Sequence, residues 1–218
     1  MIRVRAAVNR SIRENFFRRD YIELETPMLQ VIHGGAAARP FTTHMNALDM
    51  ELYLRIATEI YLKRAVVGGV DRVFEMNRNF RNEGMDSSHS PEFTSLEAYE
   101  AYSDYNGMAL LTRDLIQQAA RDAFGLPEGE EIVRLADGTE YDLSGQWDRI
   151  DLYGSTSEAL GEEVTVETPR ETLVTYAERV GLEVDDYAVS GKIVEDIFEE
   201  LVASKLWAPT FVYDFPED

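Results

Sequence analysis

Cysteine is absent from this 218-residue sequence, and histidine is scarce. Without cysteine the chain has neither disulfides nor thiolate ligands for a metal. The three histidines, His33, His44 and His89, are scattered along the chain, which argues against a structural zinc site. We therefore expect no residues that bind a structural metal.

Long hydrophobic runs are also missing. No apolar run approaches the roughly 20 residues that a membrane-spanning helix needs. The first residues, Met-Ile-Arg-Val-Arg, lack the apolar segment of a signal peptide. Hydrophobic residues make up 44% of the chain, which is enough for a packed core. These features predict a soluble cytoplasmic protein without a membrane partner.

The net charge of −20 belongs almost entirely to the second half of the chain. Residues 1–109 carry 13 basic and 15 acidic residues, whereas residues 110–218 carry 8 basic and 26 acidic residues. A basic surface of the kind that announces a nucleic-acid partner is therefore missing. Such a partner stays possible, because only the charge near the contact matters. The acidic second half is best interpreted as solvated helix faces.

Apolar spacing and turn residues predict an α+β fold with several antiparallel strands, which we expect to form one sheet with helices around it. The predicted helices cover residues 2–18, 58–67, 104–124, 168–181 and 192–206. The predicted strands cover residues 21–25, 52–56, 72–79, 92–102, 131–143 (a hairpin turning at Asp137-Gly138), 147–153 and 209–216.

Residues 72–102 contain the most unusual set of polar side chains. Two extended segments flank the polar loop 84–91, which predicts a long antiparallel pair. Period-two alternation puts Arg81 and Glu83 on one face of the first strand. The same rule aligns Phe93, Glu97 and Tyr99 on one face of the second strand, and His89 lies in the loop between them. Such a surface suits a ligand that is anionic, planar and ammonium-bearing.

Each of these residues has a plain structural interpretation when taken alone. Arg81 would be a surface cation, and Phe93 would be a core aromatic. Glu97 would be a solvated cross-strand charge. Gly34-Gly35 would be an ordinary turn, and Glu59 would complement a helix dipole. The joint pattern, rather than any single residue, favours a binding site.

Several segments together resemble the catalytic domain of class II lysyl-tRNA synthetases, and the resemblance covers essentially the whole chain. Residues 2–30, ending in Glu-Thr-Pro-Met-Leu-Gln, resemble the first motif of that family, and residues 72–102 resemble the second. The lysine-type subgroup is indicated by residues 34–41 (Gly-Gly-Ala-Ala-Ala-Arg-Pro-Phe), residues 54–64 (Leu-Arg-Ile-Ala-Thr-Glu-Ile-Tyr-Leu-Lys-Arg) and residues 97–99 (Glu-Ala-Tyr). Residues 191–195 and 209–211 continue the similarity.

The resemblance implies an antiparallel sheet flanked by helices, with residues 1–218 forming part of one catalytic domain. It also implies a two-step reaction. The carboxylate of lysine attacks the α-phosphate of ATP, giving lysyl-adenylate and pyrophosphate, and the lysyl group then passes to tRNA(Lys). The family implies Mg²⁺ as a cofactor and a homodimer formed through the first motif.

The resemblance also assigns roles to individual residues. Arg81 would bridge the lysine carboxylate and the α-phosphate, and is the expected catalytic residue. The other expected ATP contacts are Glu83 to the adenine amino group, Phe93 stacked on the ring, and His89 at the terminal phosphates. The expected lysine contacts, besides Arg81, are Gly34, Gly35, Glu59, Glu97 and Tyr99.

The sequence departs from the family pattern at three places. Thr58 stands where the family usually has Pro, and Ser90 stands where it usually has Asn near the ATP phosphates. The third motif, with a second ATP-binding Arg and the acidic Mg²⁺ ligands, is not found before Asp218, and the anticodon-binding β-barrel is not found either. We therefore expect about two thirds of a catalytic domain.

Two other interpretations stay open at this point. One is a paralogue that lysylates a protein, like the ligase that acts on elongation factor P and lacks the anticodon barrel. The other is a non-catalytic module that binds lysine or ATP, or that dimerises. The segment at residues 34–41 favours the tRNA enzyme.

Overall fold

The computed structural model describes residues 1–86 and 89–217. The chain divides into two compact units. The central unit comprises Asn9–Met108, and the acidic unit comprises Met1–Val8 with Ala109–Asp218. None of the helices in the described ranges combines the length and the hydropathy that a bilayer-spanning segment requires.

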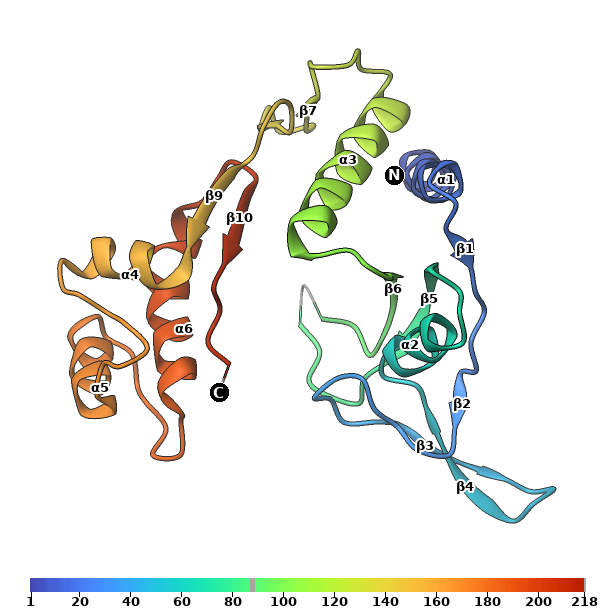
Figure 1. The fold of residues 1–218 in the computed structure, drawn as a ribbon, viewed down its shortest axis with the longest axis horizontal. Coiled ribbons are helices and arrows are strands. Elements are labelled where there is room, and N and C mark those ends of the chain that lie inside the picture. The colour runs from blue at the N-terminus through green and yellow to red at the C-terminus, as the bar shows by residue number, and fades with distance from the viewer. Residues whose placement is uncertain (87–88, 218) are drawn as a thin grey trace. The chain divides into compact units, whose positions relative to one another are not determined.

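Helices and strands alternate irregularly along the chain, as an α+β fold requires (Figure 1). The helices are α1 (Ile2–Arg18), α2 (Glu59–Val67), α3 (Tyr105–Phe124), α4 (Leu152–Leu160), α5 (Arg170–Arg179), α6 (Ser190–Leu201) and the 3₁₀ turn η1 (Ala203–Lys205). The strands are β1 (Ile22–Glu23), β2 (Leu29–Gln30), β3 (Thr42–Met45), β4 (Met50–Leu54), β5 (Arg72–Phe80), β6 (Glu92–Glu100), β7 (Ile132–Arg134), β8 (Glu140–Asp142), β9 (Asp148–Asp151) and β10 (Thr210–Tyr213).

The strands of the described residues form four small sheets. The central unit holds β1-β5-β6 and β2-β4-β3, and the acidic unit holds β7-β8 and β9-β10. The pairs β5–β6, β2–β4, β3–β4 and β7–β8 are antiparallel, whereas β1–β5 and β9–β10 are parallel. The α+β class with antiparallel pairs is thus confirmed, although the strands are divided among four sheets instead of one.

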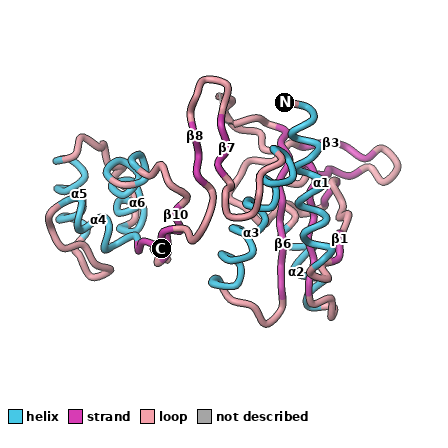
Figure 2. Tube along the Cα trace, turned by 90° about the horizontal axis from the view of Figure 1, so that it is seen from above, coloured by secondary structure: helices cyan, strands magenta, loops and turns pink. Residues whose placement is uncertain are grey.

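The long pair β5–β6 organises the central unit. Its register runs without interruption from Arg72 opposite Glu100 to Phe80 opposite Glu92, and β6 is drawn as one continuous strand (Figure 2). Helix α1 packs on the pair through Phe16, whose ring stacks on Phe74 with centroids 4.4 Å apart. Both rings are buried, so this contact anchors the strand pair to the first helix.

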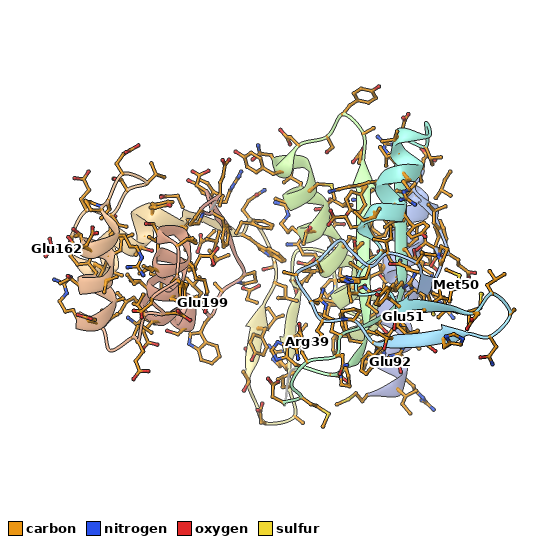
Figure 3. All side chains as sticks on the ribbon, turned by 90° about the horizontal axis from the view of Figure 1, so that it is seen from below. Arg39, Met50, Glu51, Glu92, Glu162 and Glu199 are labelled. Carbon is orange, nitrogen blue, oxygen red and sulfur yellow. The ribbon has the colours of Figure 1, made fainter. Side chains whose placement is uncertain are left out.

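The acidic unit has a separate hydrophobic core. Residues of α4, α5 and α6 form it, with Leu152, Leu173 and Ile197 almost fully buried. Acidic side chains such as Glu162 and Glu199 are exposed at the surface of this unit (Figure 3). At the start of β10 the Phe211 ring contacts Trp147, with centroids 5.3 Å apart.

Most predicted elements lie where the sequence placed them, but three predictions need correction. Residues 152–160 form α4, where no helix was predicted and where the predicted strand 147–153 extends two residues too far. The last helix ends at Leu201 instead of residue 206. Strand β5 ends at Phe80, so Arg81 and Glu83 do not share a strand face. The reason is Pro91, opposite Arg81, which has no N–H to continue the ladder.

Candidate functional site

The site lies where residues 55–58 cross the face of the β5–β6 pair. Two hydrogen bonds from backbone N–H groups fix this crossing: Phe80 N–H donates to the Arg55 carbonyl at 3.0 Å, and Thr58 N–H donates to the side-chain Oε1 of Glu97 at 3.0 Å. The segment continues directly into α2, whose first residue is Glu59. Residues far apart in the sequence, at 55–59 and 97, therefore meet over one strand pair.

Glu59, Glu97 and Tyr99 form an acidic cluster beside the start of α2. The Tyr99 hydroxyl donates to Glu97 Oε2 at 3.3 Å. Burial, the charges of Glu97 and Glu59, and that hydrogen bond together raise the pKa of Tyr99, so the phenol stays protonated. The three side chains are half-buried, and they combine two carboxylates with an aromatic face, which is a suitable environment for an ammonium group.

An ammonium group of the chain itself already lies at this cluster. Lys63 Nζ is 2.7 Å from Glu59 Oε1, one helical turn away, and 5.8 Å from the centre of the Tyr99 ring. The side chain of Lys63 is 56% exposed, so it can swing into solvent. The contact demonstrates that a primary ammonium fits between this carboxylate and this ring.

Gly34 and Gly35 bring backbone close to the same cluster. Gly35 has a φ of +90°, and a Cβ added there would lie 3.0 Å from the Cβ of Glu59 and 3.2 Å from that of Ala57. A side chain at Gly34 would have more room, with Ile60 Cγ1 at 3.9 Å. Glycine at position 35 is therefore required both by the left-handed backbone and by the closeness of α2.

Arg81 and Phe93 form the second part of the site. The Arg81 guanidinium lies over the Phe93 ring, 5.1 Å from its centre, and its Nε donates to the Ile56 carbonyl at 3.4 Å. In the part of the chain that the structure describes, Arg81 forms no ion pair. A half-buried guanidinium without a carboxylate partner is available to an anionic ligand.

Glu83 lies in the loop after β5 and is held by the backbone of Arg39, a residue of the segment 34–41 to which the sequence analysis gave no role. The Arg39 N–H donates to Glu83 Oε1 at 3.2 Å, and the Asn82 N–H donates to the Arg39 carbonyl at 2.8 Å (Arg39 is labelled in Figure 3). The sequence offered one indication that Arg39 contributes to the site, namely its position within residues 34–41.

His89 stands apart from the other predicted residues. Its exposed ring contacts Asp86 at 2.8 Å, and its backbone N–H donates to the same carboxylate. The structure thus brings Gly34, Gly35, Glu59, Glu97 and Tyr99 together beside Arg81 and Phe93, whereas Glu83 and His89 lie in the loop between the strands.

Comparison with known proteins identifies a family for the chain. The model of the family described as "tRNA synthetases class II (D, K and N)" matches residues 1–218. The chain belongs to this family. It is 56% identical over 216 residues to a lysine–tRNA ligase of Kineococcus radiotolerans and 58% identical over 216 residues to that of Mycolicibacterium gilvum. The alignments cover 99% and 98% of the chain but 42% of each relative.

A relative with a different name is also similar to this synthetase-family chain. It is the lysylphosphatidylglycerol biosynthesis bifunctional protein LysX of Mycolicibacterium vanbaalenii, which is 49% identical over 219 residues. The alignment covers 99% of the chain and 20% of that relative. The chain therefore spans less than half the length of each curated relative described here.

Below the site, this family member buries an ion pair that sequence reasoning missed. Arg55 Nη1 lies 2.7 Å from Glu75 Oε1, and the two side chains are 0% and 1% exposed. The Arg55 Nε also donates to the Arg78 carbonyl at 2.8 Å, and the Thr26 hydroxyl donates to Glu75 Oε2 at 2.6 Å. One feature of the sequence could have indicated a buried polar layer. Glu75, Asn77 and Asn79 alternate along β5, so their side chains share one face of the strand.

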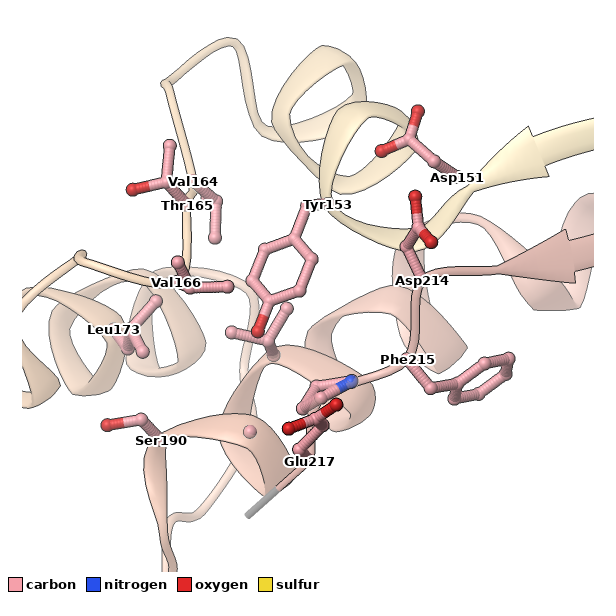
Figure 4. A pocket seen from close by; sticks show the side chains of 13 residues that line it. Asp151, Tyr153, Val164, Thr165, Val166, Leu173, Ser190, Asp214, Phe215 and Glu217 are labelled. Carbon is pink, nitrogen blue, oxygen red and sulfur yellow. The ribbon is translucent and has the colours of Figure 1, made fainter.

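The acidic unit of this chain contains an open cavity of about 800 Å³ that the predicted site does not use. Its lining includes the apolar residues Val164, Leu173 and Val194. The ring of Tyr153 lies between Val164 and Ser190 in the close-up (Figure 4). The carboxylates of Asp151 and Asp214 lie at one side (Figure 4). Within the described ranges, no group of three or more His, Cys, Asp or Glu side chains is arranged to hold a metal ion.

Proposed function

We propose that this chain is a catalytic part of a lysine–tRNA ligase, which activates lysine with ATP to lysyl-adenylate and transfers the lysyl group to tRNA(Lys). The observation that carries the proposal is the acidic cluster of Glu59, Glu97 and Tyr99, which holds a primary ammonium beside Arg81, an arginine without an ion pair in the described ranges. The family and the names of the relatives support it.

Lysine recognition needs carboxylates, because the substrate brings two ammonium groups. Glu97 and Glu59 provide two, and Tyr99 provides an aromatic face and a hydroxyl. Gly34 and Gly35 would contact the amino acid through their backbone. When lysine binds, its ammonium would displace Lys63 from Glu59 or occupy Glu97 directly.

The chemical step needs placement and charge neutralisation more than proton transfer, since the attacking group is already a carboxylate. Arg81 suits this task because its planar guanidinium can bridge the carboxylate of lysine and the α-phosphate. The guanidinium of Arg81 lies over the Phe93 ring, on which adenine would stack, so the two groups would contact neighbouring parts of ATP.

The remaining ATP contacts are assigned to the loop between β5 and β6. Glu83 would accept the adenine amino group, and His89 would reach the terminal phosphates. Mg²⁺ bound with ATP would neutralise the phosphate oxygens. The guanidinium of Arg81 is the group that suits the α-phosphate by charge and geometry.

We also propose a homodimer that works in the cytoplasm and forms through residues 2–30. Support comes from apolar side chains of this segment that stay open to solvent: Phe17 is 50% exposed, Ile22 52% and Leu29 49%. Burying such residues against a second copy is favourable. Analytical ultracentrifugation tests the dimer, and a monomer at micromolar concentration would contradict it.

Calorimetric titration with lysine and with norleucine tests the proposed substrate. Norleucine matches lysine in shape but lacks the side-chain ammonium, so it is the matched control ligand. We expect lysine to bind and norleucine to bind at least about tenfold more weakly, since the charged hydrogen bonds are lost. Equal binding of the two, or no binding of lysine, would contradict the proposal.

Activity is tested by lysine-dependent ATP–pyrophosphate exchange, followed by transfer of radiolabelled lysine to tRNA(Lys) or to elongation factor P. Exchange with transfer to tRNA supports the ligase. Transfer to the protein factor would favour the protein-lysylating paralogue. Lysine binding without exchange would favour a non-catalytic module.

The similarity to a lysylphosphatidylglycerol biosynthesis protein favours a second candidate, a role in lysyl transfer to a lipid. Adding phosphatidylglycerol vesicles to the transfer assay separates the two candidates. Label that moves from tRNA into the lipid would support the second one.

A further inference from the structure

A side chain of the chain itself lies in the proposed lysine site. Lys63 Nζ pairs with Glu59 Oε1 at 2.7 Å and lies 5.8 Å from the centre of the Tyr99 ring. Glu59 and Lys63 belong to α2, whereas Tyr99 belongs to β6. The Lys63 ammonium therefore lies at the junction of these two elements, against groups that would hold an ammonium of the ligand.

The surroundings of this ammonium suit a charged ligand. Burial raises the pKa of Tyr99, and the negative charges of Glu97 and Glu59 raise it further, so both carboxylates act on the same phenol. The ring adds the favourable interaction between a cation and an aromatic face. Two carboxylates and one ring are thus gathered at a place that one ammonium already fills.

Lys63 differs from the ordinary lysine of a helix surface pair. Lys192–Asp196 on α6 is such an i,i+4 pair, and its lysine is 53% exposed, close to the 56% of Lys63. Within the described ranges no aromatic ring lies over the Lys192 ammonium, whereas Tyr99 lies near that of Lys63. What sets the two lysines apart is the acidic cluster around Lys63.

We propose that Lys63 is a resident competitor of the substrate: its ammonium fills the place of a ligand ammonium, and lysine binds by exchanging one ammonium for another at Glu59. The inference rests on the proposed function. The exchange leaves the charge of the cluster unchanged, and the released side chain turns into solvent. Because α2 holds Lys63 one turn from Glu59, the competing ammonium is always present at a high local concentration. Only chains with Lys63 turned away can bind, which lowers the apparent affinity for lysine.

Trace acetylation of the wild type tests the exchange directly. The chain has three lysines, Lys63, Lys192 and Lys205, so mass spectrometry can follow each one after treatment with an N-hydroxysuccinimide ester of acetate. Free lysine consumes some reagent, but this affects all three side chains equally, so the ratio of Lys63 to Lys192 labelling is the readout. Saturating lysine should raise this ratio about threefold, because the Lys63 amine leaves its carboxylate and ring. An unchanged or lower ratio overturns the inference.

Two variants on α2 measure the effect on affinity. Lys63→Met removes the competing ammonium. Arg64→Met removes one positive charge from the next residue, whose guanidinium lies over the Tyr61 ring, 5.1 Å from its centre. In calorimetric titration lysine should bind about threefold more tightly to Lys63→Met and unchanged to Arg64→Met. Equal tightening in both variants would reveal a general charge effect, and weaker binding to Lys63→Met would show that Lys63 holds Glu59 in place. Either result overturns the inference.

A double-variant cycle ties the effect to the pair itself. In the Glu59→Gln background the carboxylate partner of Lys63 is gone, so adding Lys63→Met should change lysine affinity by less than about 1.5-fold. A threefold gain that persists without Glu59 contradicts the inference. Wild type that binds no lysine contradicts the proposed function, and the inference with it. Wild type that binds lysine while Lys63 labelling stays unchanged contradicts the inference alone.

Discussion

The central unit and the acidic unit place their charges in different environments. The central unit buries the Arg55–Glu75 pair completely and leaves Arg81 and Glu97 half-buried without an ionic partner in the described chain. The acidic unit holds 26 of the 41 acidic residues. Its ion pairs Arg134–Glu140, Arg179–Glu162 and Lys192–Asp196 lie on the surface, whereas its pair Arg121–Glu131 is largely buried.

This difference bears on where a ligand binds. Surface pairs contribute about 0–1 kcal/mol each, so they tolerate substitution. Burying a charge requires precise partners, and the loss of one partner of a buried pair costs about 3–5 kcal/mol. Burying a charge in the central unit therefore costs free energy unless it has a partner. Arg81 and Glu97, which are half-buried and form no ion pair in the described chain, are the candidates for binding a ligand. Net charge, by contrast, points to the acidic unit and would mislead.

The largest difference in activity between substitutions in the two units is expected for Arg81→Ala in the central unit. In any active form of the protein, loss of the guanidinium should lower lysine-dependent ATP–pyrophosphate exchange at least about 1000-fold, because charge at the α-phosphate is no longer neutralised. The control is Arg134→Ala on β7 of the acidic unit, which should leave exchange unchanged. Wild-type exchange in Arg81→Ala would refute its role.

A smaller effect is expected from Glu97→Gln. The amide keeps the size of the side chain but loses the charge, so lysine affinity should fall about 30-fold, in line with a lost charged hydrogen bond. Glu92→Gln on the same strand is the matched control, since that side chain is 55% exposed. Titration calorimetry measures both, and similar losses in the two variants would break the distinction between half-buried and exposed charge.

Two glycines with nearly the same backbone angle allow a sharper comparison. Gly35 has a φ of +90° and Gly138 has +91°, but only Gly35 has neighbours where a Cβ would go. Alanine at either position should destabilise the chain by about 1–2 kcal/mol. Only Gly35→Ala should also weaken lysine binding, because Glu59 must move. Denaturant titration and calorimetry separate the two effects; weaker lysine binding in Gly138→Ala would contradict this account.

The smallest effect concerns Asp104, before the first turn of α3. The Gly107 N–H donates to its carboxylate at 2.8 Å and lowers the pKa of Asp104. Because the folded chain lowers this pKa, the ionised carboxylate stabilises the helix at every pH above the ordinary pKa of an aspartate, about 4. This contribution is lost as the pH falls through the lowered pKa. The melting temperature of Asp104→Asn should therefore fall less between pH 4 and pH 2 than that of the wild type. Equal slopes would contradict this.

The predictions from sequence succeeded where the signal was local. The β5–β6 pair was found from alternation and a polar loop, and the helix predicted at residues 104–124 is observed at Tyr105–Phe124. The end of β5 was misjudged because Pro91, eleven residues further on, decides where the ladder stops.

The buried layer of the site could not be predicted in the same way. Arg55 and Glu75 lie twenty residues apart, and nothing in either segment shows that the two side chains meet. The brace between Arg39 and Glu83 likewise joins segments 44 residues apart. Roles in ATP or lysine binding came from the family resemblance, and they stay predictions until the variants are measured.

The contact between Trp147 and Phe211 has a practical consequence. The two tryptophans of the chain, Trp147 and Trp207, both belong to the acidic unit, whereas the central unit has tyrosines but no tryptophan. Tryptophan fluorescence therefore reports the melting of the acidic unit alone. Comparison with circular dichroism, which follows both units, would reveal whether they unfold in one transition or two.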